Sequence, residues 1–232
     1  MIVNTSIVSC RASLLTLVLI LLCTSLAVPS HAASSLIDFE EIPSIRPETT
    51  NGLQAFFQTL DYDWAELEGG VPLLILENIP YDIDQIASIK TKKRAFFMGL
   101  LPMVLLANLE IKKERADVQQ ILSRHRAGQL QDGDLERLEK ILKRYGLRGH
   151  PLTDHRTRTR LLRRVDTIPP SLVLAQAANE SAWGSSRFAR LGNNLFGEWT
   201  YKPGTGIIPA GRPAGATYEV RKFSSLYQSI RS

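Results

Sequence analysis

The stretch IPPSLVLAQAANESAWGSSRFARLGNNLFGEW, residues 168–199, joins a predicted helix to a segment rich in turns. Prolines stand where a helix can start, good helix formers follow, and Gly184 stands where the helix can stop. Apolar and small residues occur all around this helix, which predicts that it is buried on most sides. Yet the helix carries Glu180, and carboxylates are rarely buried without a partner.

The spacing around Glu180 indicates one possible role for its carboxyl group. The helix would place Gln176, Glu180 and Trp183 on one face, because they are four and three residues apart. A carboxyl group against an indole in an apolar setting would have a raised pKa, and it could then donate a proton near neutral pH. The alternative is a structural carboxylate near the helix end, solvated or hydrogen-bonded. Spacing alone leaves both interpretations open.

The segments upstream are mainly helical in pattern. The apolar run 95–109 is flanked by charges, is too short to span a bilayer and contains Pro102, so it predicts a buried, kinked helix. Residues 114–145 have the apolar spacing of a helical hairpin. The basic segment HRTRTRLLRR, residues 155–164, is typical of a solvated helix face, and a docking patch for anionic wall polymers is the alternative.

The N-terminus has the pattern of a secretory signal peptide. An apolar run at 13–28 is followed by small residues, which predicts cleavage after Ala32 and a periplasmic or extracellular location. Arg11 alone precedes the run, so an uncleaved membrane anchor stays open. Both cysteines, Cys10 and Cys23, lie in this segment, and the mature chain would have no disulfides.

Charge and motif content narrow the function classes. The net charge is +5, a modest excess that suits association with an anionic envelope surface and does not argue for nucleic acid. His125, His150 and His155 lack the spacing of metal ligands, and no GxSxG or phosphate-binding glycine loop occurs. We therefore expect neither a metal nor a cofactor.

Three motifs in order carry a family resemblance: LAQAANESAWG, then NNLFGEW, then TYEVRKF. The chain resembles the bacterial glucosaminidase family of glycoside hydrolases, and most of all its Bax-type members. The resemblance implies a lysozyme-like α+β fold, mainly helical with a small β-lobe. It also implies a helical N-terminal extension over 33–150 and a catalytic domain over 151–232. The family's domain continues with further helices, so we expect this chain to be incomplete at its C-terminal end, which leaves its own activity open.

The resemblance also implies a function and a set of site residues. The family hydrolyses β-1,4 bonds after N-acetylglucosamine in peptidoglycan, and its catalytic acid falls on Glu180. Glu219 matches the place of a second carboxylate, with the substrate's own N-acetyl group as the alternative nucleophile and Glu198 as a rival. Aromatic faces suit sugar rings, whereas core packing is the alternative role for each aromatic residue. The predicted substrate-binding residues are Gln176, Trp183, Asn194, Phe196, Glu198, Trp199 and Tyr218.

Two other functions stay open at this point. A lytic transglycosylase uses one Glu on a similar fold, although NNLFG stands where that class usually has a GLMQ-like segment. A glycan-binding domain without turnover is the other alternative, favoured by the early chain end. In each case the expected partner is the glycan strand of peptidoglycan.

Overall fold

The computed structural model describes residues 42–232, so the predicted signal segment 1–32 lies outside the described residues. Helices dominate, and the few strands are short, which confirms the expected mainly helical α+β class. In chain order the elements are β1 (Ser44–Ile45), α1 (Thr50–Thr59), the 3-10 helix η2 (Trp64–Gly69), β2 (Ile75–Leu76), α2 (Ile89–Arg126), α3 (Asp134–Arg144), α4 (His155–Arg164), α5 (Pro170–Glu180), α6 (Arg187–Gly192), β3 (Trp199–Thr200), β4 (Gly206–Ile207), β5 (Glu219–Arg221) and α7 (Leu226–Arg231).

Helix α2 is the longest element, with 38 residues. Its N-terminus is capped by Ser88, whose Oγ accepts a hydrogen bond from the backbone N–H of Thr91 at 3.2 Å. The helix continues through Pro102, so the predicted buried helix over 95–109 is confirmed but is part of a longer one. By length and apolar composition α2 could cross a membrane, yet most of that apolar segment is buried inside the protein.

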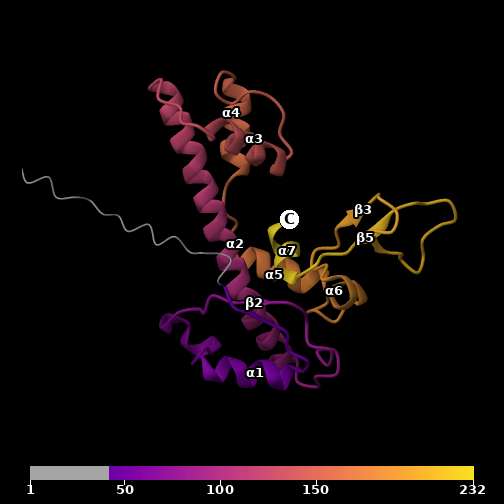
Figure 1. Ribbon diagram of the computed structural model, residues 1–232. Helices are drawn as coiled ribbons and strands as arrows, with labels where there is room; N and C mark the ends of the chain where they lie inside the picture. The colour runs from indigo at the N-terminus through magenta and orange to yellow at the C-terminus, as the bar shows by residue number, and fades with distance from the viewer. Residues whose placement is uncertain (1–41) are drawn as a thin grey trace, which may run out of the picture. The chain divides into compact units, whose positions relative to one another are not determined.

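The first core surrounds the N-terminal half of α2. Helix α1, strand β2, helix α5 and helix α7 lie around it (Figure 1). All four bury apolar side chains in this core. Fully or almost fully buried members are Leu53, Phe57, Leu76, Met103, Leu174, Leu195 and Leu226. This core fixes α5, which carries Glu180, against α2.

The second core lies between the C-terminal half of α2 and helices α3 and α4 (Figure 1). Its buried members include Val118, Ile121, Leu138, Ile141, Leu161 and Val165. Arg124 of α2 donates hydrogen bonds from Nε and Nη2 to the two carboxylate oxygens of Asp134, at 2.8 and 2.5 Å. This pairing ties the start of α3 back to α2, and the predicted helical hairpin over 114–145 is confirmed.

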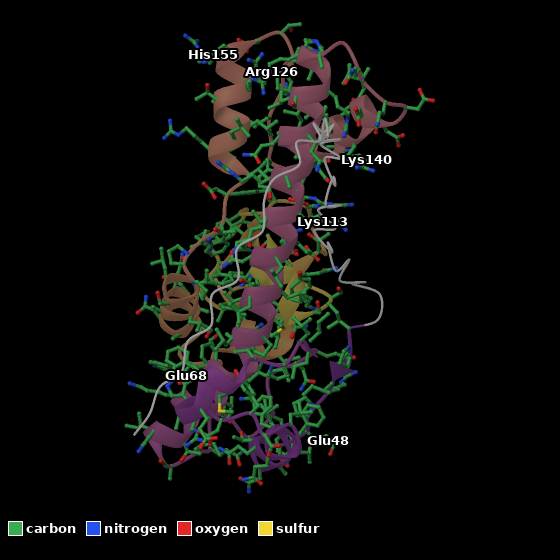
Figure 2. All side chains as sticks on the ribbon, turned by 90° about the vertical axis from the view of Figure 1, so that its left-hand side faces the viewer. Glu48, Glu68, Lys113, Arg126, Lys140 and His155 are labelled. Carbon is green, nitrogen blue, oxygen red and sulfur yellow. The ribbon has the colours of Figure 1, made fainter. Side chains whose placement is uncertain are left out.

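Charge is unevenly divided between the regions around these cores. Residues 42–88 carry eight acidic side chains and only Arg46 as a basic one, a net charge of −7. Residues 111–166 carry fifteen basic and eight acidic side chains, a net charge of +7. In Figure 2 the labelled basic residues Arg126, Lys140 and His155 lie around α3, α4 and the end of α2, away from the acids labelled near α1.

Several arginines of α4 lie on the exposed face of that helix. Arg156, Arg160 and Arg163 are exposed, whereas Leu161 is buried in the second core. The predicted solvated basic helix is therefore confirmed as a structural feature. Its use as a docking patch stays a prediction.

Candidate active site

Glu180 is the last residue of α5, and its side chain is exposed. Its Oε1 accepts a hydrogen bond from Nδ2 of Asn179 at 3.3 Å. The C-terminus of a helix carries partial negative charge, so a carboxylate in this position does not stabilise the helix. Helix stability therefore gives no reason for Glu180 to stand here.

A strained turn follows Glu180 directly. Ala182 and Trp183 have φ angles of 51° and 58°, and Gly184 continues at 78°. Non-glycine residues in the left-handed region cost about 1 kcal/mol or more each, and such residues cluster at functional sites. Ser181 holds the turn, because its buried Oγ donates to the carbonyl of Ala177 at 2.6 Å and accepts from the N–H of Gly184 at 2.9 Å.

The turn places Trp183 away from the helical face on which we expected it. Since α5 ends at Glu180, the prediction that Gln176, Glu180 and Trp183 share one helical face is wrong for Trp183. The indole instead packs in the first core, with ring centroids 6.0 Å from Phe96 and 5.2 Å from Phe97. The expected apolar enclosure of Glu180 is absent as well, because its side chain is exposed.

Helix α5 is buried on one face only, which corrects the prediction of burial on most sides. Leu174, Ala177 and Ala178 face the first core. The opposite face exposes Leu172, Gln176, Asn179 and Glu180. The small residues that suggested an enclosed helix are divided between a buried and an exposed face. Gln176 lies on the exposed face, one turn before Glu180.

The β-lobe is a three-stranded antiparallel sheet in the order β3–β5–β4. Trp199 opens β3 and is 51% exposed. Its ring meets that of Tyr218 edge-on, with centroids 5.0 Å apart and planes at 86°. Trp199 is exposed and Tyr218 is half-buried, so the pair offers a partly exposed aromatic surface of the kind that sugar rings contact.

Asn194 is buried and joins the NNLFGEW turn to β5. Its Nδ2 donates to the carbonyls of Glu198 and Arg221, both at 2.9 Å, and its Oδ1 accepts from the N–H of Glu198 at 3.0 Å. These bonds occupy both donors and the acceptor of the side-chain amide. Asn194 therefore holds the lobe together, and the structure does not place its amide where a substrate would meet it.

Glu219 is also buried, being only 5% exposed. Its Oε1 accepts from the N–H of Gly204 at 3.0 Å and its Oε2 from the N–H of Gly206 at 2.8 Å. The hydrogen bond from Gly204 is the largest cause that lowers the pKa of this carboxyl, with Gly206 and the charge of Arg212 acting in the same direction against burial. A Cβ at Gly206 would lie 2.7 Å from the Cβ of Glu219, so glycine is needed for this close approach.

Two further predicted residues have separate surroundings. Glu198 is half-buried, and its Oε2 lies 3.3 Å from Nη1 of Arg221 in an ion pair. Phe196 is partly buried and packs against the first core, so its core-packing alternative is the one that the structure shows. The structure thus gathers Glu198, Trp199, Tyr218 and Glu219 in the β-lobe.

Some exposed aromatic residues were not singled out by sequence reasoning. Tyr201 follows β3 and is 76% exposed, and Trp64 in η2 is 39% exposed. The only sequence signal for Tyr201 was its place two residues after Trp199. Nothing local in the sequence distinguished Trp64, because its ring stacks on Phe97 of α2, which is distant in sequence.

Comparisons with known proteins bear on the C-terminal part above all. Residues 158–232 match the family model Glucosaminidase, described as mannosyl-glycoprotein endo-beta-N-acetylglucosaminidase. The chain is also 34% identical, over 152 residues, to protein bax of Escherichia coli (strain K12). That alignment covers 64% of this chain and 52% of the relative, so the chain spans about half the length of the curated relative it matches. No solved structure was found to match it.

The family match includes most of α4, the Glu180 helix, the strained turn and the whole β-lobe. The relative adds similarity over a longer part of the chain than the family model alone. Residues 158–232 thus match the glucosaminidase family, and over a longer stretch the chain is similar to a Bax protein.

Proposed function

We propose that this protein hydrolyses the β-1,4 glycosidic bond after N-acetylglucosamine in peptidoglycan, with Glu180 as the general acid. One observation carries the proposal. Glu180 ends helix α5, whose opposite face is buried, and its exposed carboxyl group directly precedes a strained left-handed turn inside the region that matches the family. Rigid elements hold catalytic groups more precisely than free loops, and the first core holds α5.

The proposed chemistry assigns one proton transfer to Glu180. Its protonated carboxyl group donates to the glycosidic oxygen as the bond between that oxygen and the sugar C1 breaks. The carbonyl oxygen of the substrate's own N-acetyl group stabilises the cation-like C1 by bonding to it. A water molecule then attacks C1, gives its proton to the Glu180 carboxylate and releases the N-acetyl oxygen. Glu180 is thereby restored as an acid.

We assign Glu219 to positioning, and its role as a second catalytic carboxylate stays a prediction. Both of its oxygens already accept backbone hydrogen bonds, and the side chain is buried. It therefore orders the β3–β4 loop beside Trp199 and Tyr218. We propose that this aromatic pair contacts the sugar, with Gln176 on the open face of α5 as a polar contact.

The test is the full chain with Glu180→Gln, which keeps the shape and removes the acid. We expect release of sugar reducing ends from purified peptidoglycan to fall by at least about 100-fold, the usual scale of a general-acid contribution. Glu139→Gln is the matched control, because Glu139 is an exposed glutamate on α3. A Glu180→Gln variant that cleaves at the original rate would rule out the assignment.

Mass spectrometry of the products tests the kind of reaction. Hydrolysis leaves N-acetylglucosamine at the reducing end of each fragment, whereas a lytic transglycosylase leaves an anhydro-muramyl end. Binding to peptidoglycan sacculi without any released fragment would instead identify a glycan-binding domain without turnover.

A further inference from the structure

A hollow of about 560 Å³ lies between η2 and the first turns of α2, outside the segment that matches the family. Its lining includes Trp64, Ile89, Lys90, Lys93, Arg94 and Phe97. None of these residues takes part in the site around Glu180 as described above. We call this feature the α2 hollow.

The walls of the α2 hollow are aromatic and partly open. Trp64 and Phe97 stack, with ring centroids 5.5 Å apart and planes at 24°. The Phe97 ring also meets Trp183 at 5.2 Å. Trp64, Phe97 and Trp183 therefore form a row of rings that runs from the hollow to the strained turn after Glu180. Trp64 is 39% exposed, so its ring is accessible to a ligand.

The rim of the hollow is positively charged. Lys90 and Lys93 are exposed, and neither has a carboxylate partner within residues 42–232. Lys93 holds its Nζ 4.5 Å from the centroid of the Trp183 ring. Arg94 is paired with Asp63, which leaves the two lysines as the charges that a ligand would meet.

We propose that the α2 hollow binds a sugar unit that carries a carboxylate, as part of a glycan strand. The choice of a glycan rests on the proposed function. The C–H face of the sugar stacks on Trp64, since aromatic rings offer an apolar surface with a negative face to such groups. The carboxylate pairs with Lys90 and Lys93, which favour an acidic over a neutral saccharide.

The position of the hollow extends the site beyond the cleaved bond. Trp183 follows Glu180 by three residues, so their Cα atoms are at most about 11 Å apart. Phe97 contacts Trp183 from the other side. A glycan strand bound in the hollow would thus contact η2 and α2, and residues before 158 would take part in substrate binding.

The experiment measures equilibrium binding by titration calorimetry in the Glu180→Gln background, so that no ligand is consumed. The probes are a muramyl-containing tetrasaccharide from peptidoglycan, the same fragment with its carboxylates amidated, and the neutral chitin tetrasaccharide. We expect the carboxylated fragment to bind most tightly. Adding Trp64→Ala should weaken binding of every probe by about 5- to 10-fold, the range of one aromatic contact.

A second variant keeps the aromatic row and removes the charges. Adding Lys90→Gln and Lys93→Gln should abolish the preference for the carboxylated over the amidated fragment and remove its salt dependence. Lys143→Gln and Leu135→Ala, exposed residues on α3, are the matched controls and should bind as the Glu180→Gln protein does.

The possible results separate this inference from the proposed function. If wild type cleaves peptidoglycan through Glu180 but the Trp64 and lysine variants bind normally, the hollow is not a subsite and the inference fails alone. If wild type does not cleave but these variants lose binding as described, the inference holds and the proposed function fails. Absence of binding by all three probes overturns the inference as well.

Discussion

At the scale of single residues, Glu219 links protonation to stability. Its carboxylate accepts backbone hydrogen bonds from the loop before β4, and its folded pKa lies below the ordinary value of 4.5. A carboxyl with a lowered folded pKa stabilises the protein fully above its unfolded pKa, and this contribution is lost as the pH falls through the folded pKa. Stability from Glu219 is therefore present at neutral pH and disappears in acid.

Glu219→Gln should accordingly lower the urea midpoint at about pH 7, since an amide cannot accept both hydrogen bonds. The gap between wild type and variant should close as the pH falls below about 4.5. Urea denaturation followed by circular dichroism from about pH 7 to about pH 3 measures the difference in urea midpoint between wild type and variant, with Glu139→Gln as the reference. A gap that does not change with pH would show that the charge of Glu219 is not what stabilises the loop.

Local sequence reasoning singled out Glu180 at this scale, but its catalytic role stays a prediction and the apolar surroundings expected for it are absent. Glu180 stood out because a carboxylate in an apolar helix needs a reason, and the structure places it at a strained turn. The three hydrogen bonds of the Asn194 side chain could not be derived from spacing, because they join the turn at Glu198 to Arg221 on a strand that is distant in sequence. Its role is fixed by tertiary packing, which spacing does not show.

At the scale of elements, Glu114 on α2 is a junction between α7 and the end of α3. Arg231 of α7 donates from Nη2 to Oε2 of Glu114 at 2.7 Å and from Nε to Oε2 of Glu110 at 3.0 Å. Tyr145 donates from its hydroxyl to Oε2 of Glu114 at 2.7 Å, and Arg144 also pairs with this carboxylate. The side chains of Arg231 and Glu114 are 17% and 13% exposed, so solvent screens their pairing only in part.

Glu114→Gln should therefore reduce the free energy of unfolding by about 2 kcal/mol, between the values for exposed and fully buried ion pairs. A double-mutant cycle with Arg231→Gln, read from urea denaturation, should give a coupling of at least about 0.5 kcal/mol. Glu136→Gln, in an exposed pair with Lys140, is the comparison and should change stability much less. Additive effects of the Glu114 and Arg231 changes would mean that the contact contributes nothing of its own.

The elements themselves were largely predictable, and their ends were not. The basic stretch at 155–164 and the apolar spacing over 114–145 gave the right helices, since periodicity reports which face is buried. The end of α5 was missed because Ala182 and Trp183 are ordinary residues that adopt left-handed backbone only under the constraint of Ser181 and the first core. The extent of α2 was missed because the apolar run 95–109 and the first part of the hairpin over 114–145 were assigned to separate helices, whereas one helix continues through both.

At the scale of the whole molecule, positive charge is concentrated in residues 111–166, where neighbouring basic side chains can attract the same polyanion. Residues 111–166 carry a net charge of +7, and α4 presents Arg156, Arg160 and Arg163 together on its exposed face. Neighbouring like charges attract a polyanion more strongly than the same charges spread apart, and salt screens this attraction.

Replacing Arg156, Arg160 and Arg163 with Gln should make the protein elute from a cation-exchange resin at distinctly lower salt. The control variant removes the same total charge at Lys93, Lys202 and Lys222, which are spread over α2 and the β-lobe. We expect the salt concentration at elution to fall further for the α4 variant than for this control. Equal shifts would show that only net charge matters and that α4 is not a focused basic surface.

Because α2 contributes side chains to both cores, the sequence positions of these cores predict the order in which they form. The second core is built from residues 118–165, an uninterrupted segment whose contacts are short in sequence. The first core instead joins residues 53–104 to residues 174–226 across that segment. Local contacts form fastest, and closing an intervening loop early reduces the entropy that later, distant contacts must overcome. We therefore expect the α2–α3–α4 unit to form first and to shorten the loop that must close before the helix bearing Glu180 packs beside α2.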